Sequence, residues 1–215
     1  STFANSGVMS LESGQPTQFS LTFTQPGTYE YVCIIHNTMM TGKVVVEDAS
    51  VAIPSPADVP KQARKSINSQ LAHANKLIKE AKSLVPKSQK NPDGTTTHFV
   101  LIGFSKDQVD LMSFFPKKLK VRPGDTVEFM LSPSNDAPHT VTFLNGGEDI
   151  EFITPAPDPD NPNGPPLLLI NPEVLMPLNP GQPLTLNGVY SSGLLTPAGP
   201  TSYTLKIGDI SGDVP

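Results

Sequence analysis

Apolar and polar residues alternate along three stretches near the start of the chain. In the first of them, Phe19, Leu21 and Phe23 recur at a period of two, which is typical of a strand with one buried face. The second stretch is a Pro-Gly turn followed by alternating residues, and the third is rich in valine. The three predicted strands are residues 16–23, 25–33 and 42–47. Residues 1–49 are therefore expected to form β-structure.

Residues 50–97 change to a linker with a helical pattern. Asp58 is the expected N-cap, Pro60 lies in the first turn and Pro86 ends the pattern, so a helix is predicted over about 58–86. Apolar residues recur along it at spacings of four and three among Lys, Gln, Ser and Asn. They are Ile67, Leu71, Ala74, Ile78, Ala81 and Val85. We expect this stripe to pack against a sheet or a second helix.

Residues 98–215 return to alternating, β-branched patterns. The predicted strands are 98–104, 117–131, 139–144 and 201–207, with a turn at Arg-Pro-Gly-Asp inside the second. Between them, the proline-dense insertion 154–183 holds short apolar runs that we expect to pack on the sheet. The whole chain is predicted to be all-β with one added linker helix.

An internal repeat links the two β-regions. Residues 5–23 resemble residues 191–207: both begin with a Ser-Gly pair, and Phe19 and Leu21 match Tyr203 and Leu205. In the first copy the chain continues to a Tyr-x-Tyr-x-Cys strand. Residues 1–49 are therefore interpreted as the back part of one module and residues 98–215 as the front part of another. Such a chain is either a fragment of a longer tandem protein or a set of parts that combine, within one chain or between neighbours.

Composition excludes several classes of partner and metal site. The net charge is −5, which gives no basic face for nucleic acid. No run of apolar residues is long enough to predict a transmembrane segment. A single cysteine excludes an internal disulfide and any zinc site with two or more cysteines. Only four histidines are present, at positions 36, 73, 98 and 139.

The chemically informative segment is residues 31–47. It places Cys33, His36 and the methionines Met39 and Met40 in one short loop, and thiolate, imidazole and thioether form a soft ligand set that suits copper. A blue-copper site needs a second histidine, and His139, at the start of a predicted strand, is the candidate. By contrast, His98 is expected to be structural, and His73 to lie on the solvated side of the helix.

Three motifs together resemble the cupredoxins of the plastocyanin, azurin and auracyanin type. They are "FFPKKLKVRPGDTVEFML", "NDAPHTVTF" and "YEYVCIIHNTMMTGKVVVE". The resemblance implies a Greek-key β-sandwich and a type 1 copper held by Cys33, His36 and His139, with an axial methionine. Met40, before Thr-Gly, is favoured as the axial ligand over Met39. The linker helix and the insertion do not belong to the family pattern.

The resemblance also implies a role. An electron carrier is expected, not an enzyme, since a trinuclear oxidase cluster needs many more histidines. It would act in the periplasm or outside the cell with redox protein partners, which could dock on apolar Ile34, Ile35 and Pro138. Alternatives are a structural or assembly module of a larger redox complex or, less favoured, a copper oxidase or nitrite-reductase-like enzyme. The sequence leaves open whether His139 shares one copper with Cys33 or serves a second site, and an oligomer or strand-swapped assembly fits the pattern.

Overall fold

The structure is a computed structural model that describes residues 4–9, 16–135, 137–164 and 166–208. The N-terminal part contains β1 (Gly27–Cys33) and β2 (Asn37–Val46), followed by α1 (Val59–Leu84). The next strands are β3 (Gln89–Lys90), β4 (Thr96–Ile102), β5 (Ser105–Lys106), β6 (Val109–Asp110), β7 (Phe114–Phe115), β8 (Thr126–Leu131) and β9 (Thr142–Phe143). The remaining elements are β10 (Ile153–Ala156), β11 (Leu167–Ile170), α2 (Pro172–Leu175), β12 (Tyr190–Ser191) and β13 (Ser202–Lys206). The predicted β-class with one added long helix is confirmed.

The main sheet has the order β13-β8-β4-β3, with β7 also paired to β4. Strand β8 alternates half-buried and buried residues, as its sequence predicts, while residues 117–125 of that predicted strand form no strand. The buried face packs against the β9–β12 pair to form a two-layer core. This core consists of Val100, Ile102, Val127, Phe129, Leu131, Val141, Tyr190, Leu195, Leu205 and Ile207. One layer is therefore broad, and the β9–β12 layer is narrow.

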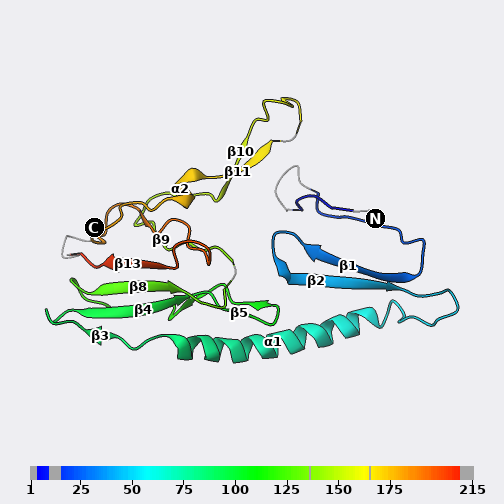
Figure 1. The fold of residues 1–215 in the computed structure, drawn as a ribbon, viewed down its shortest axis with the longest axis horizontal. Helices are drawn as coiled ribbons and strands as arrows, with labels where there is room; N and C mark the ends of the chain where they lie inside the picture. Colours follow the sequence, from blue (N-terminus) through cyan, green and yellow to red (C-terminus); the bar gives the residue numbers. More distant parts are fainter. Residues whose placement is uncertain (1–3, 10–15, 136, 165, 209–215) are drawn as a thin grey trace.

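Helix α1 extends well beyond the sheet that it covers (Figure 1). Its C-terminal half is anchored by Leu77 and Ala81, which are buried in a second cluster with Leu101, Phe104 and Phe115. The predicted stripe was wrong for the other half: Ile67 and Leu71 are 54% and 59% exposed. The reason is that the main sheet reaches only the C-terminal half of α1. The apolar stripe of the N-terminal half therefore does not face the main sheet.

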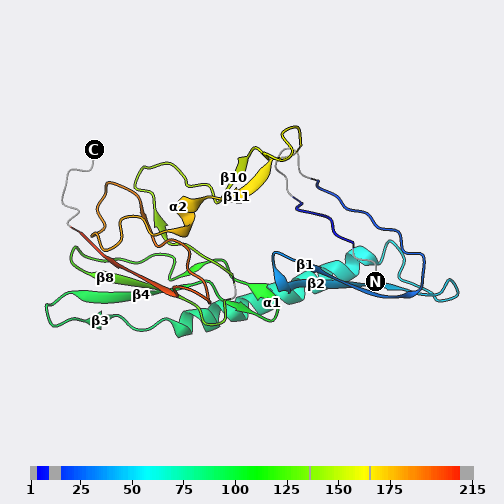
Figure 2. The same ribbon diagram turned by 45° about the horizontal axis from the view of Figure 1, so that its top comes forward.

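Strands β1 and β2 form a separate two-stranded hairpin over the N-terminal half of α1 (Figure 2). The predicted strand 16–23 was wrong, because those residues form no strand in the structure. Its repeat partner, residues 202–206, is β13 and pairs with β8. A strand needs a hydrogen-bonding neighbour, and among the described strands none pairs with residues 16–23. Part of the repeat, residues 10–15, lies outside the described residues.

The proline-dense insertion projects from the molecule as the β10–β11 hairpin (Figure 1). The expectation that its apolar runs pack on the sheet was wrong for residues 167–170, because all four residues of β11 are exposed. Their backbone pairs with β10 instead. In the short helix that follows, Asn171 caps the first turn by accepting a hydrogen bond from the Glu173 amide at 3.0 Å, and Val174 is buried. Beyond this turn, Leu178 exchanges two backbone hydrogen bonds with Ser191, so the end of the insertion is tied to β12.

Candidate metal centre

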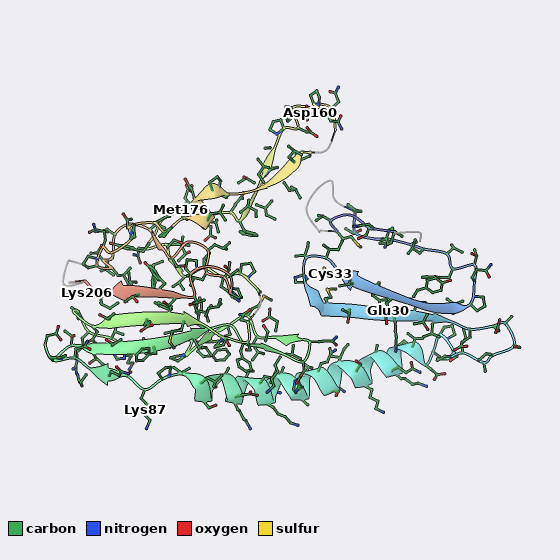
Figure 3. All side chains as sticks on the ribbon, viewed as in Figure 1. Glu30, Cys33, Lys87, Asp160, Met176 and Lys206 are labelled. Carbon is green, nitrogen blue, oxygen red and sulfur yellow. The ribbon has the colours of Figure 1, made fainter. Side chains whose placement is uncertain are left out.

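The β1–β2 hairpin positions the first group of candidate ligands. Its antiparallel register pairs Tyr31 with Gly42 and Val32 with Thr41, and then shifts so that Cys33 lies opposite Asn37. Alternation along β1 puts Tyr29, Tyr31 and Cys33 on one face. The shift ends regular pairing at Cys33 and allows the three following residues to turn. The Tyr-x-Tyr-x-Cys pattern therefore delivers the thiol to the turn end of the hairpin (Figure 3).

The turn brings the thiol and an imidazole together. Cys33 Sγ lies 3.3 Å from His36 Nδ1. In tetrahedral zinc sites, metal–sulfur bonds of about 2.3 Å and metal–nitrogen bonds of about 2.0 Å separate the two ligand atoms by about 3.5 Å. The observed separation fits two ligands of one metal ion. Cys33 is half-buried and His36 is exposed, so the pair is shielded on one side and open on the other.

Met40 is the methionine of the loop whose side chain the structure describes. It lies in β2, and its side chain is 59% exposed. The side chain of Met39 lies outside the described residues. The choice of Met40 over Met39 as axial ligand therefore stays a prediction.

His139 lies in the other β-region, beside the end of β4. Its backbone exchanges two hydrogen bonds with Leu195, which fixes its place next to β9. Its Nε2 contacts Asn135 Nδ2 at 2.6 Å, so Nδ1 is the ring nitrogen left for a metal ion. Burial lowers the pKa of His139, against a smaller opposing effect of the Asp110 carboxylate. A lowered pKa favours the neutral imidazole, which is the form that binds metals.

Asn135 and Gly103 support His139 and were missed by the sequence reasoning. Asn135 is 2% exposed, and its side-chain oxygen accepts a hydrogen bond from the Ala137 amide at 2.9 Å. Gly103 has a φ of +60°, and a Cβ at this position would collide with the Asn135 amide group and press on the His139 ring. A glycine is therefore required here for two reasons: the backbone is left-handed, and Asn135 and His139 approach it closely. A Gly directly after an apolar strand was the available signal.

The structure does not bring all the candidate ligands together in one chain. Cys33 and His36 form a pair at the turn end of the hairpin, and His139 lies with Asn135 at the sheet. Within the described residues, no group of three or more His, Cys, Asp and Glu side chains could hold a metal ion.

The two remaining histidines make other contacts. His98 Nδ1 lies 3.0 Å from Ser88 Oγ, and its Nε2 lies 3.3 Å from Asp125, which agrees with a structural role. The amide of Arg122 donates to Asp125 and is the largest cause that lowers the pKa of this carboxyl. The expected solvated setting of His73 was wrong: it is half-buried, 3.3 Å from Asp107, where the β5–β6 turn meets α1.

A cleft of about 540 Å³ opens beside His139. Its walls are mainly apolar and include Pro138, Leu144 and Phe152. Thr142 of β9 and Thr140, two residues before it, also line the cleft. The backbone of Thr140 makes no backbone hydrogen bond within the described part of the chain. Among the described strands β9 pairs with β12 alone, so its other edge is open to a further strand.

Comparison with known families agrees with the hairpin chemistry. Residues 5–47 match the family of copper binding proteins of the plastocyanin/azurin type. Comparison with curated proteins and with solved structures returned no match. Neither described helix is long and apolar enough to cross a membrane. The matched segment contains the Cys33–His36 pair and supports copper as the cofactor. The match therefore supports a cupredoxin-like, copper-binding domain over residues 5–47.

Proposed function

We propose that this protein carries one electron on a type 1 copper bound by Cys33, His36, His139 and Met40. The observation that supports it most directly is the 3.3 Å approach of Cys33 Sγ to His36 Nδ1 inside the segment that matches the copper-binding family. A copper ion held by these residues would supply one-electron chemistry between its +1 and +2 states, because thiolate and thioether favour Cu(I) while imidazole accepts both.

The chain's own residues would hold the ligands still during this cycle. The paired strands fix Cys33, and Asn135 with the Leu195 backbone fixes His139. Fixed ligands reduce the rearrangement between oxidation states. With four protein ligands, no position remains for a substrate, which favours a carrier over an enzyme. Only His73 and His98 remain for any further copper, and both have other contacts.

An apolar surface beside the ligands suits a redox protein partner. Ile34 and Ile35 are 68% and 74% exposed at the turn between Cys33 and His36, and Pro138 is exposed next to His139. Electrons would pass at this surface, with few charges to hold the partner. We place the protein in the periplasm or outside the cell, as is general for cupredoxins.

Addition of Cu(II) to the purified protein tests the proposal. We expect an intense thiolate-to-copper absorption in the visible range that disappears on reduction. Cys33→Ser should abolish this absorption, because a hydroxyl cannot replace the thiolate as the soft ligand. His73→Gln, which alters a histidine outside the ligand set, should leave it unchanged. A copper-loaded wild-type protein without this absorption would refute type 1 copper and would favour an assembly role for the module.

A further inference from the structure

The hairpin has an exposed face, and the β9–β12 layer has an unpaired edge beside an apolar cleft. One face of the hairpin carries Tyr29, Tyr31 and Cys33, and Tyr31 is 62% exposed. A two-stranded hairpin alone is marginally stable in water. The β9–β12 layer, in turn, has an open edge and an apolar cleft next to His139. We propose that the hairpin of one copy of this chain docks beside β9 of a second copy, so that the copper centre is completed between two chains.

The internal repeat supports this pairing of parts. In the first copy of the repeat, residues 16–23 lead into the hairpin. In the second copy the equivalent residues are β13, already placed at the edge of the main sheet. A hairpin of the β1–β2 kind is therefore the element that should follow β13 in a complete module. Residues 16–23 are not needed in the docked module because β13 occupies their place.

The order of ligands along each strand sets the direction of docking. Cys33 ends β1, whereas His139 precedes β9. Cys33 can therefore lie level with His139 only when β1 runs antiparallel to β9. The base of the hairpin then lies at the end of the sheet away from His139, and its turn end lies next to His139 and points away from the sheet. This direction is opposite to that in Figure 1, where the turn end of the hairpin points toward the sheet.

The chain's own hairpin cannot easily reach this position. Leu77 anchors α1 near Leu101 at the end of β4, close to Gly103 and His139. The stretch of α1 from Val59 to Leu77 is about 27 Å long. In the docked position, β1 would run from Cys33 beside His139 back to Gly27, about 23 Å away in the direction opposite to Val59. The base of the docked hairpin would therefore lie about 50 Å from Val59. The linker from residue 47 to 59, which would have to join them, spans at most about 40 Å. A second copy has no such restriction, and two copies can exchange hairpins reciprocally.

The mass of the metal-free protein in solution tests the docking without copper. We expect twice the chain mass of 23.0 kDa. Tyr31→Glu places a charge on the docked face and should give a monomer, although this side chain is exposed in one chain. Val45→Glu is the matched control: it lies on the other face of the hairpin, is 51% exposed, and should leave the dimer intact. A wild-type monomer at all concentrations would overturn the proposal.

Mixing variants tests the shared site, which rests on the proposed function. Cys33→Ser and His139→Gln should each lose the thiolate-to-copper absorption. In an equal mixture, subunit exchange should restore about a quarter of the wild-type absorption, because half of the dimers are mixed and each has one intact site of two. No restoration, or full absorption from His139→Gln alone, refutes the shared site. Absence of the absorption from wild-type protein refutes the proposed function instead and leaves the mass measurement to decide the docking.

Discussion

Truncation of Leu77 to alanine tests how α1 is held to the sheet. Leu77 is 1% exposed and packs with Leu101, Phe104 and Phe115. Leu71, almost two turns earlier on the same helix, is 59% exposed. Alanine favours helix at both positions, so helix propensity changes little in either variant. The comparison of Leu77→Ala with Leu71→Ala therefore isolates tertiary burial.

The magnitude follows from the carbon atoms removed and from their burial. Loss of three buried carbon groups costs about 2.4 kcal/mol of transfer free energy. The cavity left at a fully buried site brings the expected loss to about 2–5 kcal/mol. At Leu71, less than half of the side chain is removed from water, so the loss should be about 1 kcal/mol or less.

Urea unfolding followed by tyrosine near-ultraviolet circular dichroism measures the difference, because Tyr190 and Tyr203 belong to the sheet core. With a slope of about 2 kcal/mol per molar urea, Leu77→Ala should lower the midpoint by about 1 M or more. Leu71→Ala should lower it by less than half as much at the same protein concentration. Equal shifts for the two variants would show that α1 is not anchored through its C-terminal half.

Three further predictions concern the site and the fold. Met40→Leu should shift the copper reduction potential more than Met39→Leu, and the reverse order in potentiometric titration would assign the axial role to Met39. The lowered pKa of Asp125 means that its ionised form stabilises the folded state above the unfolded value of 3.8. That stability is lost as pH falls through the folded pKa, so acid unfolding of Asp125→Asn should depend less on pH below about 4. Electron transfer to a partner should vary little with salt, and a steep fall in rate with ionic strength would indicate a charged docking face.

Local patterns in the sequence were sufficient for the elements and for the first part of the site. Strand patterns predicted β1, β4 and β8, and the prolines near both ends placed α1 within a few residues. Cys33 and His36 meet because three residues of separation across one turn bring them together without help from the rest of the chain. These features depend on backbone geometry over a few residues, which the sequence encodes directly.

The tertiary structure decided where those patterns found partners. Residues 16–23 carry a strand pattern, yet they pair with no described strand. The first half of α1 carries a helix pattern, yet Ile67 and Leu71 stay exposed. The support of His139 by Asn135 and Gly103 likewise depends on a meeting of the end of β4 with a distant loop. Burial is a property of the surface that faces a residue, and that surface comes from parts of the chain far away in sequence. Periodicity therefore shows which face of an element can be buried, and only the assembled fold shows whether it is.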